Sequence, residues 1–146
     1  MNTVTINVES VPLPPWTDEI KDFVQRVLAI LGKDNWDLSV LFCNDACIRA
    51  LNGRFRAKDE ATDVLSFALG EWDRDRYLPG DIAISLDTLR MNASYFGVSE
   101  DEEIRRLLIH GVLHLDGMDH TGNLSAGDDP MLLLQEKILA AASLTH

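Results

Sequence analysis

The sequence has few cysteines and no long apolar run, and each absence removes a class of protein. Its two cysteines, Cys43 and Cys47, are too few for a disulfide framework and lack the second pair of a zinc site, so we expect small buried residues. No apolar run approaches the roughly 20 residues that a membrane-spanning helix needs. The first residues lack the charged start and apolar run of a signal peptide. We therefore expect a cytoplasmic protein that does not contact a membrane.

Basic residues are also scarce. The chain has 13 Lys and Arg against 24 Asp and Glu, a formal charge of −11, which argues against non-specific adhesion to nucleic acid. Any polyanionic partner must therefore be recognised locally. Four basic residues do fall within ten positions: Arg49, Arg54, Arg56 and Lys58. They form either a solvated surface or a local phosphate-binding segment.

The apolar pattern predicts one α+β domain over residues 1–146, with a small mixed sheet of about four strands and about five helices. No linker or repeat divides the chain, and 46% hydrophobic residues suffice for a core. Alternating apolar residues predict strands at 3–9, 37–43, 63–67 and 81–85, with residues 70–80 as a long polar connection in a hairpin. Helices are expected over 17–31, 44–52 and 86–96, and after Ser99 and Asp129.

Three of the four histidines lie in one short segment, as His110, His114 and His120. A capping-box sequence at Ser99 predicts the start of a helix that carries the first two histidines one turn apart on the same edge. The second half of this helix is apolar nearly all round, which predicts that it is buried. Gly117 is placed to end the helix and turn the chain back, bringing His120 toward the other two.

Three converging imidazoles predict a metal site at the end of this central helix. Burying an imidazole ring without a hydrogen-bond partner costs about 1–3 kcal/mol, whereas one Zn2+ ion can bind a nitrogen of all three rings. The spacing H-x3-H-x2-G-x2-H is also that of the metzincin zinc site. Three nitrogen ligands leave a place for a water that zinc activates, while the ion polarises the bond under attack. We therefore predict a hydrolase with one Zn2+, although other divalent transition metals also suit imidazole ligands.

The residue after the first histidine bears on the substrate. Zinc proteases with H-E-x-x-H have a glutamate there as general base, whereas this chain has Gly111. Hydrolysis of a phosphodiester also needs positive charge near the oxygens on which negative charge grows, and the segment from Arg54 to Lys58 offers it. The missing glutamate and the nearby basic segment both favour a phosphodiester over a peptide bond as the substrate.

The same residues resemble a known family. Residues 110–120 fit H-G-x-L-H-L-x-G-x-D-H, and LNGRFRAKDEATDVLSF (51–67) resembles L-N-x2-[FY]-R-x-K-D-x-x-T-D-V-L-S-F, with GDIAIS following. These motifs are similar to those of the YbeY family of bacterial rRNA-maturation endoribonucleases. The resemblance implies a metal-dependent enzyme that cuts single-stranded RNA in small-subunit (16S) ribosomal RNA maturation and ribosome quality control. The implied partners are single-stranded ribosomal RNA, the small ribosomal subunit and its assembly proteins.

The resemblance also implies roles for individual residues. The three histidines would bind zinc, and Arg56 would be the functionally important arginine. A planar guanidinium suits two phosphate oxygens, so we expect Arg56 to clamp the phosphate, with Arg54 and Lys58 as further RNA or phosphate contacts. Asp119 either holds a ring N–H of a ligand histidine or caps the turn.

Two other functions remain open from the residues. The histidine spacing alone is compatible with a metzincin-like zinc metalloprotease or other amide hydrolase. The acidic charge is compatible with a non-catalytic ribosome-assembly factor in which the metal holds the fold.

Overall fold

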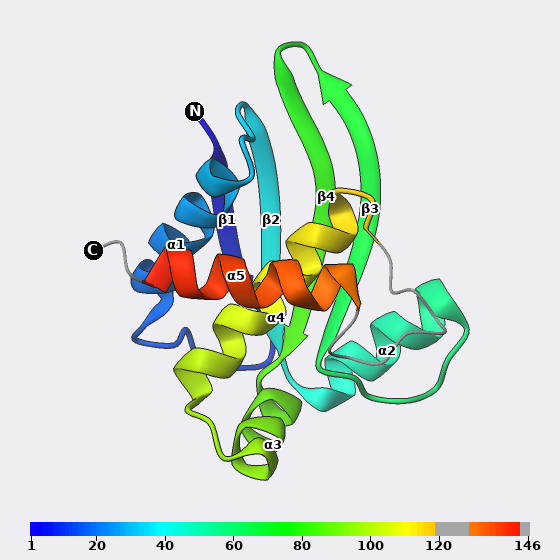
Figure 1. The fold of residues 1–146 in the computed structure, drawn as a ribbon. Coiled ribbons are helices and arrows are strands. Elements are labelled where there is room, and N and C mark those ends of the chain that lie inside the picture. The colour runs from blue at the N-terminus through cyan, green and yellow to red at the C-terminus, as the bar shows by residue number, and fades with distance from the viewer. Residues whose placement is uncertain (119–128, 144–146) are drawn as a thin grey trace.

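The computed structural model describes residues 1–118 and 129–143, in which four strands form one sheet (Figure 1). The strands are β1 (Thr3–Val8), β2 (Trp36–Cys43), β3 (Val64–Asp73) and β4 (Arg76–Ser85). Their order is β1-β2-β4-β3. β2 is parallel to both of its neighbours, whereas β3 is antiparallel to β4. The predicted mixed sheet is therefore confirmed.

Five helices in the described ranges surround this sheet: α1 (Thr17–Ile30), α2 (Asp45–Arg56), α3 (Leu86–Phe96), α4 (Glu100–Leu115) and α5 (Pro130–Ser143). The main core lies between one sheet face, α1 and α4, with α5 packed across α4 (Figure 1). A smaller cluster, formed by Cys43, Ile48, Leu65 and Ala83, lies between the opposite face and α2, and Cys47 packs against it. None of the helices in the described ranges has the length and hydropathy needed to cross a membrane.

α4, the predicted histidine helix, begins and ends where the sequence indicates. The Ser99 hydroxyl accepts a hydrogen bond from the Glu102 backbone N–H at 3.0 Å, which caps the first turn. At the other end Gly117 has a φ of +92°, and its N–H donates to the His114 carbonyl at 3.0 Å. Because only glycine adopts this left-handed conformation without strain, the helix stops there and the chain turns.

Two predicted element bounds were wrong. Residues 70–80 are not a long connection: β3 continues to Asp73 and β4 begins at Arg76, so Arg74 and Asp75 alone form the turn. The residues of β3 from Ala68 onward are exposed, and a strand that leaves the core needs no apolar alternation. α2 likewise runs to Arg56 rather than ending at residue 52, because its last turn is solvated and its basic residues suit a helix C-terminus.

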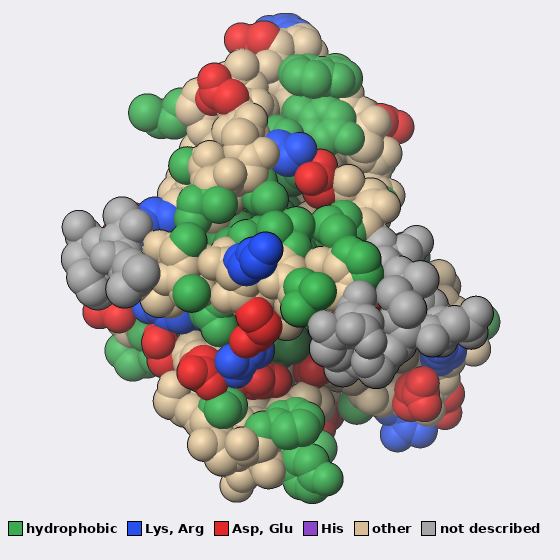
Figure 2. Space-filling model, viewed as in Figure 1, with side chains coloured by type: hydrophobic (Ala, Val, Ile, Leu, Met, Phe, Trp, Pro, Cys, Tyr) green, Lys and Arg blue, Asp and Glu red, His purple; other side chains and the backbone are tan. Residues whose placement is uncertain are grey.

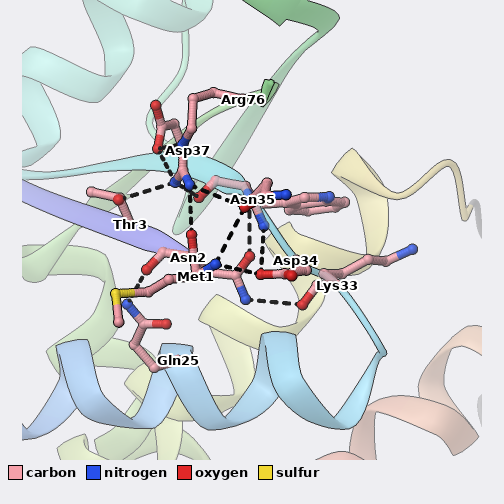
Figure 3. Close-up of polar contacts among 10 residues, drawn as sticks. Met1, Asn2, Thr3, Gln25, Lys33, Asp34, Asn35, Asp37 and Arg76 are labelled. Atoms are coloured by element: carbon pink, nitrogen blue, oxygen red, sulfur yellow. Dashed lines mark hydrogen bonds and ion pairs between the residues drawn. The ribbon is translucent and has the colours of Figure 1, made fainter. Parts of the chain in front are cut away.

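Arg76 connects three strands at the start of β4 (Figure 3). Its guanidinium donates to the Thr3 hydroxyl at 3.1 Å, to the Trp36 carbonyl at 3.0 Å and to the carboxylate of Asp37. The hydrogen bonds from Arg76 lower the pKa of Asp37. These contacts tie the turn end of the β3–β4 hairpin to β2 and β1.

Candidate metal and phosphate site

His110 and His114 project together from the same edge of α4. Their Nε2 atoms are 3.0 Å apart, and their ring centroids are 4.6 Å apart. Both side chains are half-buried, because α4 is embedded in the core on its other sides. The helical spacing therefore presents two imidazole nitrogens to one point.

A cavity of about 420 Å³ opens beside the histidine pair. Its walls come from α2, the segment after α2, β3 and α4, and they include Arg56, Lys58 and Ser66 as well as His110 and His114. The two sequence motifs, more than forty residues apart in the chain, thus line one space. Positive side chains and imidazoles therefore line the same space.

Arg56 lies in the last turn of α2 and lines this cavity. One Nη2–H donates to the Ser66 carbonyl at 2.6 Å, and the guanidinium carbon lies 5.9 Å from the centre of the Phe67 ring. A guanidinium carries five N–H donors, so within the described residues most of the Arg56 donors remain available to a ligand. This arrangement suits contact with a phosphate.

The other predicted contact residues separate in space. Lys58 lines the cavity with Arg56, whereas Arg54 lies over the ring of Phe55 and lines a different hollow beside Cys47. The structure therefore places Arg56 and Lys58, but not Arg54, next to the histidine pair. His120 and Asp119 lie outside the described residues.

Gly111 allows α4 to approach the sheet closely. A Cβ at this position would lie 2.8 Å from Ile82 Cδ1 and 3.1 Å from both Cγ atoms of that side chain. A glutamate there, as in the H-E-x-x-H proteases, would run into the core rather than reach the cavity. The backbone of Gly111 also supports the site wall, since the Ser66 hydroxyl donates to its carbonyl at 3.5 Å.

The donor set fits a transition-metal ion such as zinc. Imidazole nitrogens bind Zn2+ at about 2.0–2.1 Å, so two of them on a tetrahedral ion lie about 3.3 Å apart. The 3.0 Å separation of the two Nε2 atoms is close to this value. The described residues alone contain no group of three His, Cys, Asp or Glu side chains able to hold a metal, so a third ligand remains the role predicted for His120.

Gln135, which sequence reasoning missed, contacts the first histidine. Its Oε1 lies 2.9 Å from His110 Nδ1, and the glutamine is 8% exposed. The signal was available: Gln135 is a polar residue in the buried stripe of α5, together with Met131, Ile138 and Ala142. A polar residue in such a stripe needs a buried partner.

The surface around α4 and α5 carries charges of both signs. Figure 2 shows acidic and basic side chains side by side on this face, rather than a continuous basic surface. Beneath it, Glu103 on α4 is 7% exposed, and burial followed by the nearby charge of Asp63 raises its pKa. Within the described residues, Arg56 and Lys58 are the basic side chains that line the cavity.

Paired imidazoles on one helix, in a cavity that an arginine also lines, fit the class of metal-dependent phosphodiester hydrolases. The model of the family Endoribonuclease YbeY matches residues 4–143. The chain therefore belongs to the YbeY endoribonuclease family, as its two motifs indicated.

Individual relatives agree with this membership. An Endoribonuclease YbeY of Treponema pallidum is 47% identical over 145 residues, covering 96% of this chain and 89% of the relative. That of Treponema denticola is 43% identical over 145 residues, covering 94% and 92%. A solution structure of a Thermotoga maritima protein has a TM-score of 0.66 at 26% identity, covering 96% of this chain and 89% of its own.

Proposed function

We propose that this protein is a metal-dependent endoribonuclease that hydrolyses phosphodiester bonds of single-stranded RNA during maturation of 16S ribosomal RNA. Membership of the YbeY family supports the activity. The observation that carries the proposal is the single cavity that Arg56 lines together with the paired imidazoles of His110 and His114.

In this proposal His110, His114 and His120 hold one divalent ion, which we take to be Zn2+. When bound, such an ion supplies Lewis-acid polarisation of the phosphodiester and makes water a better nucleophile at neutral pH. Arg56 binds two non-bridging phosphate oxygens and stabilises the negative charge that grows on them during displacement. Lys58, a point charge on the same wall, holds a neighbouring phosphate.

The shape and charge of the site bear on the substrate and its delivery. A flexible single strand can bend its backbone into the cavity, whereas a stiff A-form duplex presents its phosphates on a convex surface. The net charge of −11 opposes long-range attraction of RNA, so we propose that the small ribosomal subunit or its assembly proteins bring the two together.

Cleavage of labelled single-stranded fragments of small-subunit rRNA tests the proposal. The zinc-loaded protein should cut the fragments, lose activity with a chelator, regain it with Zn2+ and spare the same fragment annealed to its complement. Cleavage that chelation leaves unchanged would contradict the metal role. Turnover of peptides instead of RNA would favour the amide-hydrolase alternative, although the packing at Gly111 argues against it.

Addition of small ribosomal subunits to the same assay tests the proposed delivery. Cleavage of rRNA within the subunit should be faster than cleavage of the isolated fragment. Equal rates would argue against recruitment. Normal rRNA maturation in cells whose only copy lacks all three motif histidines, yet folds, would instead favour a non-catalytic assembly factor.

A further inference from the structure

We propose that Gln135 is a positioning residue that keeps the proton of His110 on Nδ1 and so directs the Nε2 lone pair toward the metal position. The inference rests on the proposed metal role of His110. It assigns a function to α5, which contributes no residue to the predicted ligand set.

The first step is the contact itself. Gln135 Oε1 and His110 Nδ1 are 2.9 Å apart, which is an ordinary hydrogen-bond distance. An amide oxygen can only accept, so the imidazole nitrogen must donate and therefore carries the proton. The Nε2 of a neutral His110 is then the unprotonated nitrogen, and it is the one that faces His114.

The second step is the orientation of the amide, because a flipped glutamine would offer N–H instead of oxygen. The other end of the amide settles this point. Gln135 Nε2 donates to a carboxylate oxygen of Glu136 at 3.4 Å, and a carboxylate can only accept. With the NH2 group directed at Glu136, the oxygen is directed at His110.

The third step is the anchoring of α5 on α4. Arg106 lies one turn before His110, and its Nε and Nη2 donate to the Glu136 carboxylate at 2.9–3.1 Å. A further Arg106 N–H donates to Glu102 at 2.8 Å, and the hydrogen bonds from Arg106 lower the pKa of Glu136. This bidentate pair joins α5 to α4 at Glu136, the residue next to Gln135.

The expected consequence is tighter metal binding. A free imidazole exchanges its proton between two nitrogens and rotates, whereas the glutamine selects one tautomer and one ring orientation before the ion arrives. Partners of ligand histidines commonly change metal affinity by about 10- to 100-fold. Loss of the Gln135 oxygen should weaken Zn2+ binding by a factor in this range.

Competition with a zinc-chelating dye measures the affinity directly. In the full chain, Gln135→Leu removes the acceptor, Gln135→Met does so with a closer match in shape, and Gln135→Glu keeps an acceptor oxygen. Both apolar variants should bind Zn2+ more weakly, whereas Gln135→Glu should retain most of the affinity. Gln25→Leu is the matched control, because it removes a 2.8 Å glutamine hydrogen bond to Asn2 far from the site.

The tautomer itself is visible in ¹⁵N NMR of the metal-free protein. The neutral His110 ring should carry its proton on Nδ1 in the wild type, and Gln135→Leu should shift it toward the usual mixture. Wild-type affinity in both apolar variants, or a proton on Nε2 of wild-type His110, would overturn the inference. A protein that shows both effects but cuts no RNA would contradict the proposed function and leave this inference standing.

Discussion

The two walls of the cavity differ in how firmly they hold their functional side chains. On the α4 wall, behind which α5 packs, His110 is half-buried and hydrogen-bonded to Gln135, and the Arg106–Glu136 pair joins the two helices. On the α2–β3 wall, Arg56 is exposed and makes one hydrogen bond within the described residues. The difference predicts that the proposed metal side is organised before binding, whereas the proposed phosphate side adjusts to the substrate.

Packing explains this contrast. Nine residues of α4 are buried, and the helix touches β3, β4, α1, α3 and α5. Only Ile48 and Asn52 are buried in α2, near the middle of the helix. Side chains on a helix enclosed by neighbours lose their alternative rotamers, while those on a solvated last turn keep them.

The largest effect should come from removing a histidine from the α4 wall. We expect His114→Ala to abolish zinc binding and reduce RNA cleavage to background, because two remaining imidazoles hold the ion poorly. Metal analysis of the purified variant and its cleavage rate check this. The control is His146→Ala, which changes the histidine outside the motif and should keep both properties. Full zinc content in His114→Ala would contradict the ligand assignment.

A substitution on the α2–β3 wall should lower the cleavage rate without changing the zinc content. We expect Arg56→Ala to lower kcat by about 10²–10³-fold, the usual effect of removing one group that stabilises transition-state charge. Zinc content and thermal stability should stay at wild-type values, because the side chain is exposed. The matched control is Arg54→Ala on the same helix, outside the cavity. An equal loss in both variants would move the phosphate contact to the open surface of α2.

Alanine substitutions at one glycine in α4 and one in α2 compare how tightly the two helices pack, through the free energy of unfolding. Gly111→Ala should destabilise the protein by about 1–3 kcal/mol, since its Cβ would press on Ile82 and push α4 away from β4. Gly53→Ala in α2 should stabilise by up to about 1 kcal/mol, because among the described residues the new Cβ meets only the Lys58 carbonyl at 3.7 Å, and alanine favours the helix. Urea unfolding of both variants measures the difference. A tolerated Gly111→Ala would show that the α4–β4 contact can relax.

The smallest effect concerns Glu103, a buried acid on α4. Its pKa is raised on folding, so the folded protein favours the protonated form, and stability is lost as pH rises from the unfolded pKa through the folded one. Glu103→Gln should therefore stabilise at pH 7 by about 0.5–2 kcal/mol, a normal range for one stabilising substitution. This gain in stability should become smaller at acidic pH, where Glu103 is protonated in both the folded and the unfolded protein. Urea unfolding across pH measures it, and a destabilised variant at pH 7 would show that the charge is needed.

Much of the fold could be predicted because its signals are local. The mixed α+β class, the cap at Ser99 and the stop at Gly117 follow from residue patterns a few positions long. The extent of the β3–β4 hairpin could not be predicted in this way, since exposed strand residues carry no apolar alternation. The last turn of α2 could not be predicted for a similar reason, because its basic side chains resemble those of a solvated loop.

By itself, the sequence determined that His110 and His114 share one helix edge, because a period of about 3.6 residues puts positions four apart on the same side. Only the tertiary structure decided which side chains meet them. β3 pairs with β4 beneath α4, so the last turn of α2 and the segment that follows it line the cavity with Arg56 and Lys58, while α5 crosses α4 and places Gln135 against His110. Such contacts join residues distant in the chain, and they depend on how whole elements pack rather than on any local pattern.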